Sequence, residues 1–427
     1  MMWKKQPNLL SILISVTLLS LPLYVIRCSS FSLCVSPVPF TLLEILILVT
    51  FGYWFYLQIR AKNLKQKVFE IQNKIPKTIQ VFIFIFLLSG LIGGFVSPDL
   101  RAGLGIYKAY FLEGFLLSVV VFDYLQTTKN SKLIVWSLIC SALWVAVIAI
   151  LNNLLNYNPG NPIEFLERGR ASAVYTTSNA VGLLLGPATA LMFGYLLSLK
   201  NTKKSVLNEK NLALFILVIL VLGVWVSGSR GAFVGIFAGF LFFLGYKLYS
   251  RFSNQNKKFL ARVFNIGLII FSAIIFLFFL NISVSAKNPP RIPVNFQSSF
   301  NSRLCLWDGA VRIIKERPLF GSGLSGFEKV HEEFRTCSRE NSIYPHNIFL
   351  NFWTEVGLFG LVSFIGMCTL LFYGLLAKKL DYLNLGIASI LVVILFHGLV
   401  DVPFFKNDLS VQMWAILALG LYRLEES

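Results

Sequence analysis

The amino-acid sequence predicts an all-α integral membrane protein with about twelve transmembrane helices and one long outer loop before the tenth. Of its 427 residues, 56% are hydrophobic and 40 are Phe, a composition typical of polytopic membrane proteins. About 20 apolar residues suffice to span a bilayer. Such stretches lie at residues 9–26, 38–58, 78–96, 103–125, 132–152, 172–199, 211–226, 231–249, 263–283, 346–377, 383–404 and 409–424. We therefore expect nine helices in residues 1–283, the outer loop in 284–345, and three helices in 346–427.

Lysine and arginine are concentrated in alternate connections between these stretches. If the N-terminus with Lys4 and Lys5 is cytoplasmic, the basic segments 60–77, 200–210 and 247–262 lie on the cytoplasmic side, as the positive-inside rule requires. The net charge of +18 is then a topology signal that also suits anionic lipid headgroups. We expect a protein of the cytoplasmic membrane with both termini in the cytoplasm and no nucleic-acid partner.

Several motifs that would indicate other chemistry are missing from the sequence. It has no CxxC or HExxH zinc spacing, no P-loop and no GxGxxG. Enzymology that needs ATP or a dinucleotide is therefore unsupported. The cysteines Cys140 and Cys368 lie in apolar stretches, where packing is expected. The other four share outer loops in two pairs, and spacing leaves open whether either pair forms a disulfide. These pairs are Cys28 with Cys34 and Cys305 with Cys337.

The long outer loop should contain two short helices. Apolar residues at helical spacing predict a helix over residues 303–316, and a second is expected over 327–334. Between them, the glycines of the segment 321–326 mark turns. About 60 residues are too few for a dependable independent core. We therefore expect the loop to fold onto the helix bundle as a cap.

His346 lies where this loop enters the tenth apolar stretch. It follows Pro345, and the apolar residues IFLNFW come directly after Asn347. Histidine has a reference pKa near 6.5, so it exchanges a proton near neutral pH. A titratable group held at the membrane surface suits chemistry on a lipid-linked anionic substrate. His346 is therefore the leading candidate for a catalytic residue.

Two arginines near the predicted outer helix ends are candidate anion ligands. Arg230 lies in a tight turn, VSGSRGAF, whose glycines let the backbone bend sharply. Arg303 is expected at the start of the first loop helix, where a cation gains nothing from the helix dipole. For Arg230, snorkelling to lipid headgroups is the alternative. For Arg303, the alternative is a solvated loop side chain.

Other polar residues near the predicted helix ends have plainer interpretations. His397 and Asp401 are spaced i and i+4 on the predicted eleventh helix, so a structural hydrogen bond is favoured over catalysis. Glu44, Lys108 and Glu113 either neutralise one another between helices or line a polar cleft. His331 lies in a charged stretch of the loop and is expected to be solvated.

Three blocks of sequence resemble the O-antigen ligase family and its O-antigen polymerase relatives. These blocks are SGSRGAF, RLCLWDGAVRIIKERPLFGSGLSGF from Arg303, and PHNIFLNFWTEVGLFGL from Pro345. The segments RASAVYTTSNAVGLLLGP at 170–187 and HGLVDVPFF at 397–405 are also similar to family positions. Together the blocks cover about the C-terminal 60% of the chain.

The resemblance implies a GT-C-like membrane glycosyltransferase. Such enzymes move a glycan from undecaprenyl diphosphate to an acceptor on the periplasmic side, and they need neither a metal ion nor a nucleotide. The implied acceptor is lipid A–core oligosaccharide or another surface glycan or protein. The family's loop histidine falls on His346, and its two arginines fall on Arg230 and Arg303. Residues in a possible supporting role are Arg170, Asn179, His397 and Asp401.

Two alternatives stay open at this point. A polymerase-type enzyme would extend the glycan itself, and the order of SGSRG, Arg303 and His346 favours the ligase pattern over it. A transporter or flippase of lipid-linked saccharide would suit the number of helices. Against a transporter, the polar groups lie at outer helix ends rather than at the midplane, and no internal repeat is detected.

Overall fold

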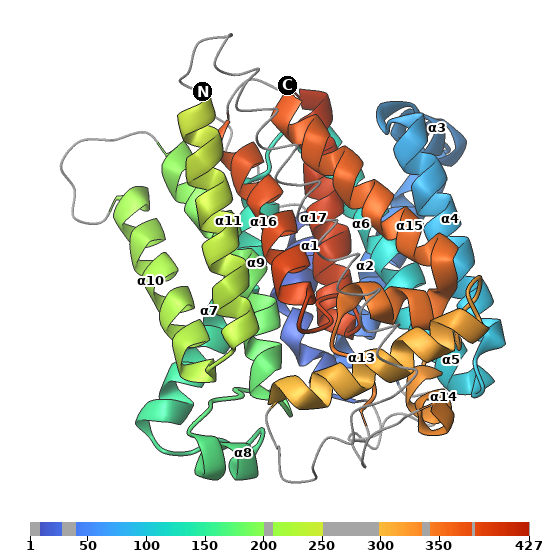
Figure 1. Cartoon of the computed structure of the whole chain (residues 1–427). Helices are drawn as coiled ribbons and strands as arrows, with labels where there is room; N and C mark the ends of the chain where they lie inside the picture. Colours follow the sequence, from blue (N-terminus) through green and yellow to red (C-terminus); the bar gives the residue numbers. More distant parts are fainter. Residues whose placement is uncertain are drawn as a thin grey trace.

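A computed structural model describes the chain as a bundle of helices (Figure 1). The described residues are 9–27, 40–199, 208–250, 299–334, 342–377 and 381–426. Eight of their helices are long and apolar enough to cross a membrane, which makes this a multi-pass membrane protein. The eight are α2 (Leu42–Arg60), α4 (Lys77–Val96), the continuous α5–η3–α6 (Leu100–Thr128), α7 (Lys132–Leu154), α9 (Ser178–Ser198), α10 (Glu209–Ser227), α11 (Arg230–Tyr249) and α15 (Ile348–Ala377).

The prediction of about twelve spanning helices is only partly confirmed. α1 (Leu9–Leu19) is short, because the chain turns into the 3-10 helix η1 (Leu21–Val25) at Pro22. α16 (Tyr382–Gly398) is also short, and the more polar α17 (Asn407–Glu426) does not qualify as a span. The predicted helix at 263–283 lies outside the described residues.

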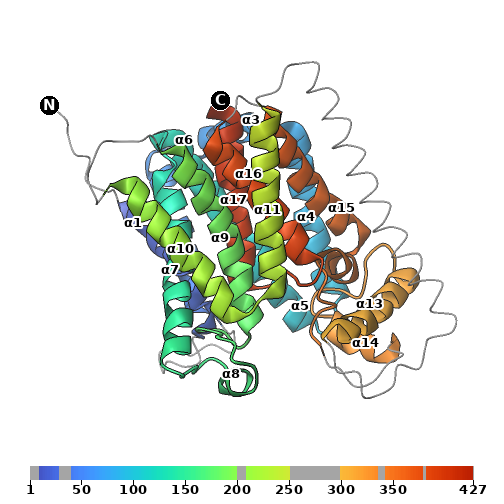
Figure 2. The same ribbon diagram turned by 60° about the vertical axis from the view of Figure 1, so that its left-hand side comes forward.

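The helices α9, α16 and α17 form the centre of the bundle, and the outer helices surround them (Figures 1 and 2). Almost every residue of α9 and α17 is buried. Small residues let the central helices approach closely. A Cβ on Gly194 of α9 would lie 2.5 Å from the Cα of Gly386 of α16. The backbones of α9 and α16 are therefore in direct contact at this point.

Of the two interpretations of Glu44, Lys108 and Glu113, the structure shows ion pairing between helices. Lys108 lies in η3 (Tyr107–Leu112), a π-helical turn between α5 (Leu100–Ile106) and α6 (Glu113–Thr128). Its Nζ lies 3.0 Å from Glu44 Oε2 and 3.6 Å from Glu113 Oε1. The Asn407 amide donates to Glu44 Oε1 at 3.1 Å. We refer to Glu44, Lys108, Glu113 and Asn407 as the lysine cluster.

The loop before α15 packs on the bundle, as expected. Its helices are α13 (Ser299–Glu316) and α14 (Phe327–Phe334), and their apolar side chains contact Leu350 of α15. They lie at the same end of the bundle as α8 (Pro162–Arg168), opposite α3 (Leu64–Lys74) (Figures 1 and 2). The buried Glu355 of α15 accepts hydrogen bonds from the backbone of Ser325 and Phe327. This carboxylate fastens the start of α14 to the bundle.

Two expectations about the loop are wrong. α13 begins at Ser299, so Arg303 lies one turn inside the helix rather than at its start. His331 is 3% exposed and not solvated, because α14 packs this face against α13. Its ring lies 4.9 Å from that of Phe327, and a Cβ on Gly309 would lie 2.4 Å from its Cδ2.

The cysteines fit their expected classes where the structure describes them. Cys140 and Cys368 are free thiols, in agreement with packing roles. Cys305 is disulfide-bonded. Cys337, the other cysteine of this loop, lies outside the described residues, as do Cys28 and Cys34.

Candidate functional site

His346 lies directly before α15, held by the residue that caps this helix. The side chain of Asn347 accepts from the backbone N–H groups of Phe349 and Leu350, and its amide donates to the carbonyl of Leu399 at 3.1 Å. His346 itself has φ +50°, in the left-handed region that histidine tolerates better than most residues. One third of its side chain is exposed. The imidazole is therefore rigidly placed and still accessible.

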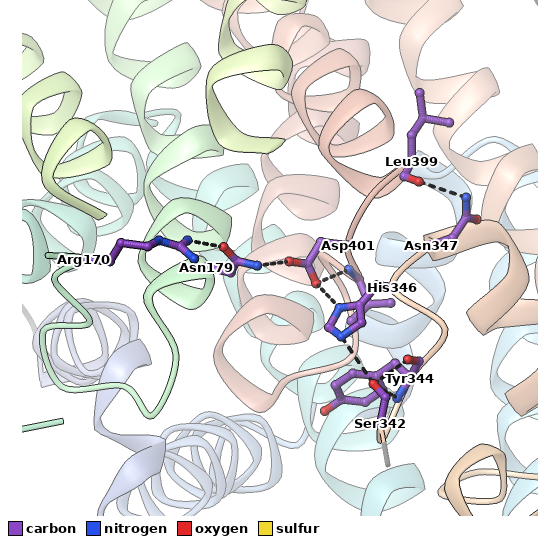
Figure 3. A network of polar contacts seen from close by, with 9 residues as sticks. Arg170, Asn179, Ser342, Tyr344, His346, Asn347, Leu399 and Asp401 are labelled. Carbon is purple, nitrogen blue, oxygen red and sulfur yellow. Dashed lines mark hydrogen bonds and ion pairs between the residues drawn. The ribbon is translucent and has the colours of Figure 1, made fainter. Parts of the chain in front are cut away.

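The two imidazole nitrogens of His346 have different partners (Figure 3). Nδ1 lies 3.2 Å from Oδ1 of Asp401, and Nε2 lies 3.3 Å from the hydroxyl oxygen of Ser342. An ionised carboxylate only accepts hydrogen bonds, so Nδ1 carries the hydrogen in this pair. Neutral His346 then has its lone pair on Nε2. The Ser342 oxygen thus lies beside this nitrogen, while its hydroxyl hydrogen is donated to the Tyr344 carbonyl at 2.8 Å.

Asp401 is an anion at neutral pH despite being 4% exposed. Burial alone would raise its pKa, but the hydrogen bond to His346 and the nearby charges of His346, His397 and Lys406 lower the pKa below its usual range. The backbone N–H of Val402 also donates to Oδ1 at 3.0 Å. An ionised, immobilised carboxylate therefore faces His346.

The expected i, i+4 pairing of His397 with Asp401 on one helix is wrong. α16 ends at Gly398, three residues before Asp401. Asp401 instead belongs to the buried loop between α16 and α17, which turns its carboxylate toward His346. His397 is 2% exposed and lies at the end of α16.

A chain of hydrogen bonds extends from Asp401 to Arg170 (Figure 3). The amide nitrogen of Asn179 donates to Asp401 Oδ2 at 3.1 Å, and its oxygen accepts from Arg170 Nη2 at 2.6 Å. Arg170 Nε donates to the carbonyl of Ser227 at 3.0 Å. Asn179 lies in the first turn of α9, which begins at Ser178 and not near residue 172 as expected.

Arg230 lies just after the predicted tight turn, as the first residue of α11. Gly228 adopts φ +60°, and Ser229 caps the helix by accepting from the backbone N–H of Ala232. The Arg230 side chain is exposed. The next residue, Gly231, lies against His397, since an added Cβ would be 2.5 Å from its Cδ2.

Arg303 approaches the same region from the cap. Its side chain is half-buried in α13, and its charge lies within electrostatic reach of the His397 imidazole. His397 also interacts with Asp401 and contacts the residue after Arg230. His397 thus lies near Arg303, near Asp401 and against the backbone of the residue that follows Arg230.

Three contacts in this region were not predicted from the sequence. The Ser342 hydroxyl at His346 Nε2 and the ring of Tyr344, edge-on at 6.4 Å, come from residues just before the histidine. Proximity in the chain was their only signal. The Ser227 carbonyl that binds Arg170 is a backbone group, which carries no signal in a residue pattern. Among the described residues, no group of three or more His, Cys, Asp or Glu could hold a metal ion.

Comparison with known proteins finds a family match for the part of the chain that contains these residues. Residues 215–365, which include Arg230, Arg303 and His346, match the family model described as O-antigen ligase. The chain is also 26% identical over 196 residues to an uncharacterized protein of Haemophilus influenzae. That match covers 43% of this chain and 47% of the relative, so the chain spans about half the length of the relative it matches. In this multi-pass membrane protein, residues 215–365 are therefore similar to the O-antigen ligase family.

Proposed function

We propose that this protein transfers a glycan from undecaprenyl diphosphate to an acceptor hydroxyl at the outer face of the cytoplasmic membrane. The O-antigen ligase domain supports a membrane glycosyltransferase-type activity on a lipid-linked glycan. The observation that carries the mechanism is the pairing of His346 Nδ1 with the buried anionic Asp401, which leaves Nε2 beside a hydroxyl group. That arrangement suits a general base.

In this proposal His346 accepts the proton of the attacking hydroxyl. As Nε2 takes the proton, the acceptor oxygen forms a bond to the anomeric carbon of the donor sugar. The bond between that carbon and the diphosphate oxygen breaks, and its electron pair leaves with undecaprenyl diphosphate. Attack from the face opposite the diphosphate inverts the anomeric configuration. A base in this role contributes about 10²–10⁴-fold to the rate, and Asp401 stabilises the imidazolium that forms.

Arg230 and Arg303 would bind the diphosphate. A guanidinium is always protonated and offers two parallel N–H groups to phosphate oxygens, so it stabilises the charge that develops on the leaving group. Arg230 is exposed at the start of α11, and Arg303 comes from the cap, so the two would enclose the diphosphate from different segments. With the leaving group neutralised in this way, we expect no need for a metal ion or a nucleotide.

The proposal has a ligase form and a polymerase form, which differ in the acceptor of the glycan. The order of the SGSRG turn, Arg303 and His346 favours ligase-type transfer to lipid A–core oligosaccharide or another surface molecule. A polymerase-type enzyme would instead use a second lipid-linked glycan as acceptor. Both forms use the same base and the same arginines.

A reconstituted transfer assay tests the proposal. The purified protein in liposomes would receive undecaprenyl-diphosphate-linked oligosaccharide and each candidate acceptor, and the product's size would separate ligation from polymerisation. Arg230→Lys keeps the charge but loses the two parallel N–H groups of the guanidinium. It should therefore raise the KM for the donor roughly tenfold or more. Arg101→Lys, at an exposed position of α5, is the matched control and should leave the KM unchanged.

Two results would contradict the proposal. Equal donor KM values for Arg230→Lys and Arg101→Lys would remove Arg230 from the diphosphate site. Movement of the lipid-linked donor across the bilayer, without transfer to any acceptor, would favour a transporter instead.

A further inference from the structure

We propose that Arg170 and Asn179 are positioning residues that lock the turn before Arg230 and the His346–Asp401 pair into one rigid unit. This inference rests on the proposed function. It assigns roles to two side chains that take no part in the reaction itself. The relevant observation is that Arg170 donates a hydrogen bond to the turn before Arg230 and another to the amide of Asn179. The same amide donates to the Asp401 carboxylate, which pairs with His346.

Arg170 first fixes the turn. Its Nε donates to the Ser227 carbonyl at 3.0 Å, and the backbone N–H of Ala171 donates to the carbonyl of Val226 at 3.0 Å. A Cβ on Gly228 would lie 3.1 Å from Arg170 Nε, so the guanidinium lies directly against the turn. The backbone from Ser227 to Arg230 is therefore tied to Arg170 on one side.

Asn179 then connects Arg170 to Asp401 through two hydrogen bonds. Arginine can only donate and an ionised carboxylate can only accept, so an amide between them has one satisfactory orientation. Its oxygen faces Arg170 Nη2 at 2.6 Å and its nitrogen faces Asp401 Oδ2 at 3.1 Å. Three residues further along α9, a Cβ on Gly182 would lie 2.5 Å from Ser229. The same helix turn therefore packs on the turn before Arg230.

The hydrogen bond from Asn179 fixes the orientation of the Asp401 carboxylate. Oδ2 is held by Asn179, while Oδ1 faces His346 Nδ1 and the backbone N–H of Val402. Without the bond to Oδ2, the carboxylate can rotate and the imidazole loses its fixed direction. A misplacement of about 1 Å at a reacting group can reduce the rate about 10²-fold. Loss of the Asn179 bond should therefore reduce kcat more than it changes substrate binding.

This assignment separates Arg170 from Arg230. The Arg170 guanidinium already donates to two protein groups, whereas the Arg230 side chain is exposed. Arg170→Lys keeps a positive charge but cannot donate to Ser227 and Asn179 with the same fork. We expect it to lower kcat and to leave the donor KM within about twofold. A rise in donor KM like that of Arg230→Lys would make Arg170 a substrate ligand and overturn the proposal.

Asn179→Asp gives a readout that a merely structural role would not move. It would place a second carboxylate between the Arg170 guanidinium and Asp401, and the like charge of the two carboxylates raises the pKa of one of them. At low pH the shared proton can replace the amide hydrogen bond; at higher pH the two charges repel. The activity of Asn179→Asp relative to the unchanged protein should therefore fall as pH rises. Asn156→Asp adds the same charge at an exposed site and should give a flat ratio.

The closing experiment reads the position of the His346 proton without needing transfer. The chain has only 3 histidines, so ¹⁵N-histidine NMR of the full-length protein, with His346→Ala for assignment, resolves the Nδ1–H form. We expect this form to predominate in the unchanged protein and to lose its preference in Asn179→Ala. An unchanged His346 signal in Asn179→Ala overturns the positioning role, even if transfer occurs. A changed signal supports it, even if the proposed transfer fails.

Discussion

Two groups of charged side chains lie near the start of α17, and they differ in what their charges contact. In the lysine cluster, Lys108 is shared between Glu44 and Glu113, and its Nζ also lies 4.2 Å from the centre of the Phe40 ring. At His346, one imidazole nitrogen is paired with Asp401 and the other faces a hydroxyl group. In the lysine cluster every charged group has an oppositely charged partner within the cluster. The His346 group leaves one nitrogen available for exchange.

The positions of the two groups in the fold follow the same division. The charged members of the lysine cluster lie within helices, Glu44 in the first turn of α2 and Lys108 and Glu113 in the continuous α5–η3–α6. His346, Asp401 and Arg170 lie outside helices, directly before α15, between α16 and α17, and between α8 and α9. The comparison teaches that a buried charge alone does not mark a reaction site. An accessible donor or acceptor that is not paired with an opposite charge is the more useful sign.

Among substitutions that compare the His346 group with the lysine cluster, Asp401→Asn should have the largest effect on kcat. The new amide must present a donor either to the Asn179 amide or to the His346 Nδ1 hydrogen, so one hydrogen bond becomes repulsive. We expect kcat to fall by roughly tenfold or more. Asp99→Asn is the matched control, because the Asp99 side chain is 40% exposed, pairs with Lys329 and caps α5, a role that Asn also fills. Equal kcat values for the two variants would contradict the orienting role.

The same Asp401 substitution has a pH signature in stability. The pKa of Asp401 is lower in the folded protein than its ordinary value. Its ionised form therefore stabilises the fold above the unfolded pKa of about 3.9, and this stabilisation is lost as pH falls toward the folded pKa. Melting curves should show that the loss of stability below about pH 4 is smaller in Asp401→Asn than in the unchanged protein.

A substitution in the lysine cluster should reduce the stability of the fold and leave turnover unchanged. Lys108→Met leaves the buried Glu44 carboxylate without its ion pair, which should destabilise the fold by up to about 3 kcal/mol. Turnover per folded molecule should stay near that of the unchanged protein. Lys132→Met is the control, because its pair with Glu209 is exposed and contributes less than about 1 kcal/mol. A large loss of turnover in stable Lys108→Met protein would break the distinction between the two groups.

The sequence predicted most of the helices, because apolar runs of spanning length are a strong signal. It misplaced the end of α16, since Val402, Phe404 and Phe405 are apolar residues of a buried loop. Apolar composition cannot separate a buried loop from a helix, and Pro403 was the available sign of the difference. The number of spanning helices stays a prediction for the segment outside the described residues.

The candidate site was predicted as a set of residues rather than as a geometry. His346 stood out at its junction, and the spacing of His397 and Asp401 suggested a pair that the fold does not make. Asp401 pairs instead with a residue 55 positions earlier, because the loop after α16 passes the start of α15. Single-chain spacing reports neighbours on one helix and carries no information on such contacts between distant segments.

The most direct test of the central claim is the kcat of His346→Ala in the reconstituted transfer assay, measured beside donor binding and thermal stability. The account predicts that kcat falls by about 10²–10⁴-fold, while donor KM and melting temperature stay close to those of the unchanged protein. Near-normal turnover in folded His346→Ala protein would contradict the assignment of His346 as the general base.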